Sequence, residues 1–242
     1  MSHPVKICAH RGLSALCPEN TLPAFAAALA LGADEIELDI RWTKDQQLII
    51  SHDMDLTRIS DGEGLLSEKT LDELRCVNIG VKHGWTVSFA TPDELFSLLG
   101  DRIVYNLHVK EAGENGALIR DLAACIRRHG LTGNCYFAAS PRELEWMEKV
   151  EPGIPRCAIQ LPNDEIVIEE MAAKYGCTRV QFWLGMYDRG TIDRLHARGV
   201  SCNLYYADTL EDMRLQADLG IDTLLTNRCD WGKVFMKEYA EP

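Results

Sequence analysis

Short apolar runs alternate with longer segments of helical periodicity along most of the chain. Short apolar runs bounded by turn residues are typical of buried strands, and apolar positions three and four apart are typical of helices. The predicted strands are Val5–Ala9, Glu35–Ile40, Ile103–Val109, Cys135–Ala138, Arg156–Gln160, Arg179–Trp183, Ser201–Tyr205 and Thr223–Thr226. The predicted helices include Leu22–Leu31, Leu118–Arg128, Arg142–Val150, Glu165–Lys174, Ile192–Ala197 and Leu210–Leu219.

Eight strands separated by helical segments predict a parallel βα repeat, and eight strands close a TIM (β/α)8 barrel. The alternative is a doubly wound open sheet, which normally carries a glycine-rich phosphate loop after its first strand. The first strand here instead ends in His10-Arg11-Gly12. We therefore predict the α/β class and a TIM barrel.

One stretch after the second strand departs from this repeat. Leu48–Ile50 reads as a ninth strand, and the polar residues 44–47 before it are too few for a crossover. A hairpin with Asp45 and Gln46 as its loop would pair Asp39 with His52. Residues of about 54–90 then form an insertion before a helix that starts near Thr91. We expect one barrel domain over residues 1–242 with this small inserted subdomain.

Composition narrows the classes of partner. The chain has 242 residues, 46% hydrophobic and 26% charged, which is typical of a globular protein. Its net charge of −12 argues against nonspecific nucleic-acid binding and against docking on anionic lipid. The nine cysteines form no C-x-x-C pair, and neither a signal peptide nor a membrane-length apolar stretch is visible. We expect a cytoplasmic protein with free thiols, no membrane insertion and a small-molecule substrate; the oligomeric state stays open.

Ionisable residues gather at the ends of the first three barrel strands, where TIM barrels carry their active sites. Glu37 and Asp39 are two residues apart on one strand, and His108 and Lys110 are two apart on another, so each pair shares a face. His10 and Arg11 end the first strand, and the hairpin brings in His52. A single ionisable residue at a strand end more often has a structural role. Burying all of these ionisable side chains together without a ligand, however, would cost a large amount of free energy.

These side chains suit metal-assisted phosphoryl transfer. Paired carboxylates bind hard divalent cations, and Arg11 and Lys110 can hold phosphate oxygens. Two histidines can supply a general acid and a general base, since imidazole titrates near neutral pH. Trp183 ends another strand and is expected to line the pocket.

Several motifs, in order and spacing, resemble those of the glycerophosphodiester phosphodiesterase family: His10-Arg11-Gly12, Pro18-Glu19-Asn20-Thr21, Glu37-Leu38-Asp39, His52-Asp53, Thr91-Pro92-Asp93-Glu94 and Gly220-Ile221-Asp222. The resemblance implies a TIM barrel with an inserted subdomain, and cleavage of glycerophosphodiesters to sn-glycerol 3-phosphate and an alcohol. It also implies that His10 and His52 form the acid/base pair and that Glu37 and Asp39 bind Mg²⁺ or Ca²⁺. Arg11, Asn20 and Lys110 would lie at the phosphate.

The chain departs from the family pattern at its third metal ligand. His108 stands where the family usually has a glutamate, and an imidazole shifts the preference toward Mn²⁺ or Zn²⁺. Glu111 is near in sequence but at odd spacing from His108, so it should face away. Asn227 replaces the usual aspartate of a C-terminal motif, and Tyr205 or Tyr206 replaces a common tryptophan.

Two alternatives remain beside the leading interpretation. One is a related enzyme of the lysophospholipase D or sphingomyelinase D type, for which we expect an exposed apolar rim at the mouth. The other is a barrel that binds a phosphorylated ligand and turns it over weakly, because His108 and Asn227 alter the site.

Overall fold

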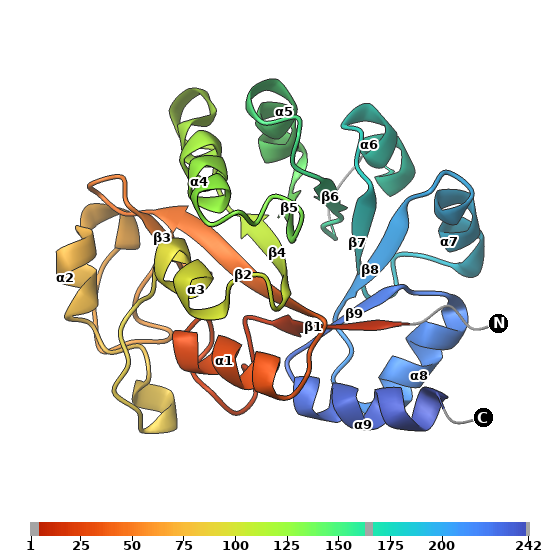
Figure 1. Ribbon diagram of the computed structural model, residues 1–242, viewed down its shortest axis with the longest axis horizontal. Coiled ribbons are helices and arrows are strands. Elements are labelled where there is room, and N and C mark those ends of the chain that lie inside the picture. Colours follow the sequence, from red (N-terminus) through yellow and green to blue (C-terminus); the bar gives the residue numbers. More distant parts are fainter. Residues whose placement is uncertain (1–4, 163–166, 241–242) are drawn as a thin grey trace.

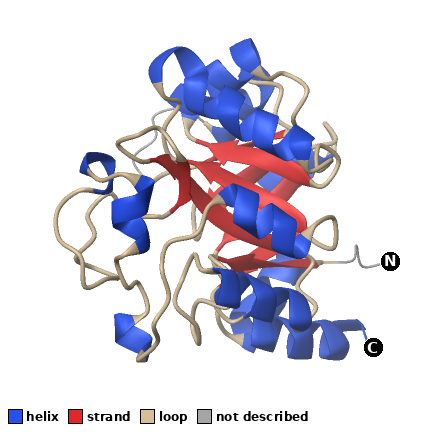
Figure 2. Ribbon diagram, turned by 60° about the vertical axis from the view of Figure 1, so that its left-hand side comes forward, coloured by secondary structure: helices blue, strands red, loops and turns tan. Residues whose placement is uncertain are grey.

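The computed structural model describes residues 5–162 and 167–240, and these form a closed parallel barrel surrounded by helices (Figures 1 and 2). The barrel strands are β1 (Lys6–His10), β2 (Glu35–Trp42), β4 (Val104–Val109), β5 (Cys135–Ala139), β6 (Arg156–Ile159), β7 (Arg179–Trp183), β8 (Ser201–Tyr205) and β9 (Thr223–Thr226). Strand β1 pairs with both β2 and β9, which closes the ring. The prediction of a TIM (β/α)8 barrel is confirmed.

The outer layer consists of α1 (Leu22–Ala30), α3 (Pro92–Leu99), α4 (Ala117–Arg128), α5 (Pro141–Val150), α6 (Ile168–Lys174), α7 (Arg189–His196), α8 (Leu210–Leu219) and α9 (Cys229–Ala240). The predicted strands agree with the observed ones to within two residues. The predicted start of the sixth helix at Glu165 lies outside the described residues. Thr91 caps α3 in a reciprocal pair with Glu94, as the sequence predicted.

The alternation along β2 explains how a buried strand can carry three carboxylates. Ile36, Leu38 and Ile40 belong to the main apolar core between strands and helices. The residues between them, Glu35, Glu37 and Asp39, therefore point into the barrel, because successive strand side chains face opposite sides. Glu35 lies lowest and bonds Tyr136 Oη at 2.7 Å and Arg179 Nη1 at 3.2 Å inside the barrel. This polar layer forms the floor beneath the strand ends.

The hairpin after β2 forms, but its predicted register is wrong by one residue. Strand β3 (Leu48–Ile50) pairs antiparallel with β2, with Ile40 opposite Ile50. The loop thus has three residues, and Gln46 takes a left-handed conformation with φ of 56°. Thr43 stabilises this longer loop, because its Oγ1 accepts from Gln47 N at 3.0 Å. Asp39 O consequently accepts from Ser51 N rather than pairing with His52.

Residues 54–90 leave the barrel between β3 and α3 and contain η1 (Leu66–Glu68), α2 (Leu71–Arg75) and η2 (Val81–His83). They lie at the left of Figure 1, in orange and gold. Their apolar side chains form a cluster separate from the main core, comprising Leu56, Ile59, Leu66, Leu74, Ile79 and Phe89 together with Ile49 of β3. Because the cluster shares Ile49 with the hairpin, we propose that this insertion is a subdomain of one barrel domain.

The nine cysteines are free thiols, and the eight that are buried pack as small apolar side chains.

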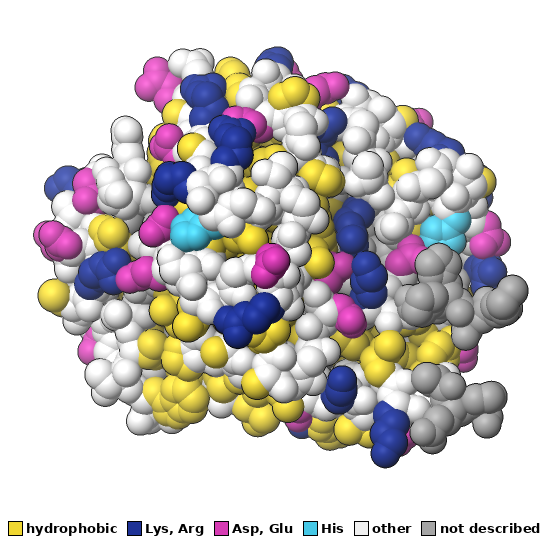
Figure 3. Space-filling model, viewed as in Figure 1, with side chains coloured by type: hydrophobic (Ala, Val, Ile, Leu, Met, Phe, Trp, Pro, Cys, Tyr) yellow, Lys and Arg dark blue, Asp and Glu magenta, His cyan; other side chains and the backbone are white. Residues whose placement is uncertain are grey.

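Figure 3 shows acidic and basic side chains interspersed over one face of the molecule, around scattered apolar patches. Among the residues that the structure describes, no helix combines the length and apolar character that crossing a bilayer requires.

Candidate active site

A cavity of about 280 Å³ opens at the carboxyl ends of the barrel strands. Seven residues predicted from the sequence line it: His10, Arg11, Glu37, His52, His108, Lys110 and Trp183. The other lining residues are Ile159, Gln160, Leu161, Gln181, Phe182 and Tyr205. The cavity therefore has a charged side, from β1, β2, β4 and the loop after β3, and a largely apolar side from β6, β7 and β8.

The loop after β1 takes a conformation with positive φ at Arg11 and Gly12, and backbone contacts hold it in place. Arg11 has a φ of 57°, and its N–H donates to the backbone oxygen of Glu37 at 3.0 Å. Gly12 follows with a φ of 80°, and a Cβ there would lie 2.7 Å from the carbonyl carbon of Ala24. Only glycine fits such a close approach in this conformation. The loop thereby fixes His10 and Arg11 at the cavity wall.

Glu37, Asp39 and His108 form a compact set of potential metal ligands. His108 Nδ1 lies 3.2 Å from Asp39 Oδ1 and 3.6 Å from Glu37 Oε1. One ligand atom from each residue lies within 4.8 Å of the others. Both carboxylates are buried, whereas His108 is half-buried at the cavity.

Positive charge already compensates these carboxylates. Lys110 Nζ lies 3.2 Å from Asp39 Oδ1, and Arg11 Nε lies 3.3 Å from Asp39 Oδ2. Burial opposes ionisation of Asp39, but Lys110, the neighbouring His108 imidazole and the Arg11 guanidinium outweigh it and hold the pKa of Asp39 well below its ordinary value. Asp39 is therefore an anion at neutral pH.

The donor set fits a divalent cation. Asp39 Oδ1 is buried and makes no hydrogen bond of good geometry within the described residues, although Lys110 Nζ and His108 Nδ1 each lie 3.2 Å from it. A buried carboxylate oxygen in that state is costly unless a cation completes its surroundings. Two carboxylates and an imidazole suit Mn²⁺ or Zn²⁺ as well as Mg²⁺.

Asn20 lies behind Asp39 rather than at the cavity wall, and its expected place at the phosphate stays a prediction. It is buried, its Nδ2 donates to Asp39 Oδ2 at 2.9 Å, and it is absent from the cavity lining. Its irregular loop, with a φ of 57° at Asn20, turns the side chain toward β2. In this position Asn20 orients the Asp39 carboxylate.

A chain of hydrogen bonds orients His10. Asp208 accepts from Asn227 N at 2.8 Å and from Asn227 Nδ2 at 2.7 Å, so the Asn227 amide can point only its oxygen toward His10. That oxygen lies 2.8 Å from His10 Nδ1 and also accepts from Ser14 Oγ. His10 Nδ1 must therefore carry a hydrogen. Its Nε2, 3.8 Å from Glu37 Oε2, is left as the reactive nitrogen.

His52 is oriented in a comparable way by its neighbour in the chain. Its Nδ1 lies 2.6 Å from Asp53 Oδ1, and Arg58 contacts the same carboxylate. Arg41 binds the backbone oxygen of His52 at 2.7 and 2.9 Å. Burial, together with Lys110 and Arg11, lowers the pKa of His52 despite the opposing carboxylates. His52 is therefore a neutral imidazole at neutral pH.

Aromatic side chains cover the other wall. The Tyr205 ring packs edge-on against His10, with centroids 4.8 Å apart, and lies 5.1 Å from the Trp183 ring. Trp183 is 39% exposed, so its face is available to a bound molecule. Trp183 lines the cavity, as expected from its place at the end of β7, and its contact with substrate stays a prediction.

Sequence reasoning missed the supporting residues Asp53, Asp208 and Ser14. Asp53 directly follows a candidate histidine, a proximity that could have signalled a hydrogen bond. Asp208 lies in the loop after β8, and no spacing rule connects it to Asn227. Glu111 faces away from the cavity as predicted, since its Oε1 accepts from Trp42 N at 3.1 Å.

Comparison with known proteins places this geometry in a family. Residues 10–231 match the model of the glycerophosphoryl diester phosphodiesterase family. A glycerophosphodiester phosphodiesterase of Caldanaerobacter subterraneus is 41% identical over 108 residues, which cover 43% of this chain and 44% of that protein. One of Bacillus subtilis is 23% identical over 244 residues, covering 92% of this chain and 83% of that protein. The matched segments thus span about half the length of the first curated relatives.

Solved structures agree in fold. An Oleispira antarctica phosphodiesterase in complex with the product sn-glycerol-3-phosphate superimposes with a TM-score of 0.87 at 20% identity, covering 96% of each chain. A glycerophosphodiester phosphodiesterase of Thermotoga maritima gives a TM-score of 0.81 at 23% identity, covering 98% of this chain and all of that one. The family model covers nearly the whole chain, and three of the motifs contribute residues to one cavity, namely His10 and Arg11, Glu37, and His52. This chain belongs to the glycerophosphoryl diester phosphodiesterase family.

Proposed function

We propose that this protein hydrolyses glycerophosphodiesters to sn-glycerol 3-phosphate and an alcohol, with a divalent cation and two histidines. The observation that carries the proposal is one cavity that contains both oriented imidazoles, a compact carboxylate–imidazole cluster and two cationic side chains. The Oleispira phosphodiesterase of the same fold is described with sn-glycerol-3-phosphate as its product, which supports this choice of substrate.

Glu37, Asp39 and His108 are the residues proposed to hold the cation. A bound divalent cation polarises a phosphoryl oxygen and stabilises the charge that develops on it. Lys110 and Arg11 both contact the Asp39 carboxylate. Both line the cavity, so we propose that they bind the other phosphoryl oxygens.

The two histidines divide the proton transfers. His52 is neutral and its Nδ1 is occupied by Asp53, so its Nε2 can remove a proton from the attacking water molecule, whose oxygen forms the new bond to phosphorus. His10 then supplies a proton to the departing alcohol oxygen as the phosphorus–oxygen bond breaks. The Asn227 oxygen binds the Nδ1 hydrogen of His10, so the proton exchanged with substrate is the one on Nε2.

Metal removal and restoration test the proposal. The chelated protein should release no glycerol 3-phosphate from glycerophosphocholine, and activity should return with Mn²⁺, Zn²⁺, Mg²⁺ or Ca²⁺ added in turn. Glu37→Gln should abolish the restored activity, whereas Glu111→Gln should keep it, because Glu111 faces away from the cavity. Tight phosphodiester binding without turnover under every metal would instead support the weakly active binding barrel.

A second candidate is hydrolysis of a lysophospholipid. No apolar loop follows His52 or Lys110, but Trp183, Leu184 and Tyr206, at or directly after the ends of β7 and β8, expose 39–48% of their surface. Leu161 adds an exposed apolar side chain after β6. Such a rim could contact an acyl chain. Parallel assays with glycerophosphocholine and lysophosphatidylcholine distinguish the two, and preference for the lipid would favour this candidate.

A further inference from the structure

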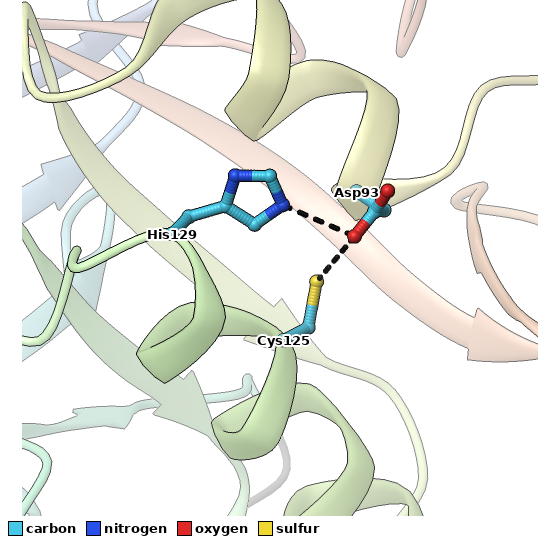
Figure 4. A group of neighbouring side chains, drawn as sticks. All are labelled: Asp93, Cys125 and His129. Carbon is cyan, nitrogen blue, oxygen red and sulfur yellow. Dashed lines mark hydrogen bonds and ion pairs between the residues drawn. The ribbon is translucent and has the colours of Figure 1, made fainter.

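A second group of metal-ligating side chains lies between helices α3 and α4, and none of its members lines the active-site cavity. Asp93 is in the first turn of α3, and Cys125 and His129 are four residues apart at the end of α4. Figure 4 shows the thiol and the imidazole aimed at the same oxygen of Asp93. His129 Nε2 lies 3.0 Å and Cys125 Sγ 3.7 Å from Asp93 Oδ1.

These separations are close to those around a tetrahedral ion. Zinc binds nitrogen and oxygen at about 2.0–2.2 Å and sulfur at about 2.3 Å, which places neighbouring ligand atoms roughly 3.3–3.8 Å apart. The three donor atoms here lie within 4.8 Å of one another, so small side-chain rotations suffice. The backbone of both helices can stay in place.

The chemistry of the donors selects the ion. A thiolate and an imidazole favour Zn²⁺, whereas Mg²⁺ and Ca²⁺ prefer oxygen ligands. The thiolate and the Asp93 carboxylate together balance the charge of a divalent cation. Cys125 itself is buried, but it borders an open groove that Asp93 and Asp121 also line, which gives a cation access from solvent.

We propose that Asp93, Cys125 and His129 form a zinc site that joins α3 to α4, separate from the catalytic cation. Arg128 competes for this site, because its Nη2 donates to Asp93 Oδ1 at 2.9 Å. The Arg128 side chain is 61% exposed and can move into solvent when a cation binds. The proposal does not depend on the proposed enzymatic function.

Cobalt titration tests this site without interference from the active site. Co²⁺ replaces Zn²⁺ and gives a near-ultraviolet charge-transfer band only with a thiolate ligand, and the active-site cluster contains none. The wild-type protein, freed of metal, should develop this band, and added Zn²⁺ should remove it. Cys125→Ser should abolish the band and His129→Gln should weaken Co²⁺ binding, whereas Arg128→Gln should strengthen it.

Two cysteine variants serve as controls. Cys202 lies with His196 and Asp222 in another three-residue cluster, and Cys76 is the exposed thiol. Cys202→Ser and Cys76→Ser should both keep the band, and circular dichroism should show that Cys125→Ser is folded. No band in the wild-type protein, a band that persists in Cys125→Ser, or equal loss in either control would overturn the proposal.

Discussion

Asp208 offers a sharp test of how His10 is oriented, because it touches His10 only through Asn227. Asp208 Oδ1 accepts from Asn227 N and Thr226 Oγ1, and Oδ2 accepts from Asn227 Nδ2. In Asp208→Asn, a side-chain NH₂ would face the Asn227 NH₂. The Asn227 amide would then lose this bond or turn over, presenting its nitrogen to His10. His10 Nδ1 would then have to accept a hydrogen bond, which disfavours the doubly protonated imidazolium that donates the Nε2 proton.

The expected effect follows from the bond that is lost. A hydrogen bond to a charged group contributes about 1.5–3 kcal/mol. Since about 1.36 kcal/mol corresponds to a tenfold change in rate, kcat should fall roughly 10- to 150-fold. KM should change little, because Arg11 and Lys110 keep their contacts.

The assay is steady-state release of glycerol 3-phosphate from glycerophosphocholine by the metal-loaded protein. Glu211→Gln is the matched control, because Glu211 is exposed in the first turn of α8, three residues from Asp208. Thermal unfolding followed by circular dichroism verifies that both variants fold. An unchanged kcat in folded Asp208→Asn, or an equal fall in Glu211→Gln, would refute the reasoning.

Two further predictions concern the carboxylate–imidazole cluster. His108→Glu should shift the metal preference toward Ca²⁺ or Mg²⁺. The variant should also keep its metal at lower pH than the wild type, because a carboxylate ligand stays deprotonated to lower pH than an imidazole. Metal titrations of the variant and the wild type that coincide would instead indicate that His108 is only hydrogen-bonded. The folded-state pKa of Asp39 lies below its unfolded value, so its ionised form stabilises the fold above about pH 4, and this contribution disappears as pH falls through the folded pKa. Urea unfolding should therefore show a stability difference between wild type and Asp39→Asn that is largest near neutral pH and shrinks in acid, and a difference independent of pH would contradict the account.

Most of the cavity was predictable because strand geometry repeats every two residues. That period places Glu37 with Asp39 on the inner face of β2, opposite the apolar residues that pack on the helices. It places His108 and Lys110 together at the end of β4 in the same way, and the ring of strands then brings both pairs to one mouth.

The errors lie in loops, where no such period applies. The hairpin register shifted because Gln46 adopts a left-handed conformation that asparagine or glycine would have signalled. Asn20 turned toward Asp39 because its loop backbone also has positive φ. Asp208 and Asn227 meet across the ends of two neighbouring strands, a contact that depends on the pairing of β8 with β9.

The central claim is that two imidazoles at one barrel mouth carry out cleavage of the phosphodiester. The most direct measurement is kcat for glycerol 3-phosphate release by purified, metal-loaded His10→Ala and His52→Ala, with folding verified by circular dichroism. Because general acid–base catalysis contributes about 10²–10⁴-fold, each variant should lose at least about 100-fold in kcat while remaining folded. Near-normal turnover by either folded variant would contradict the account.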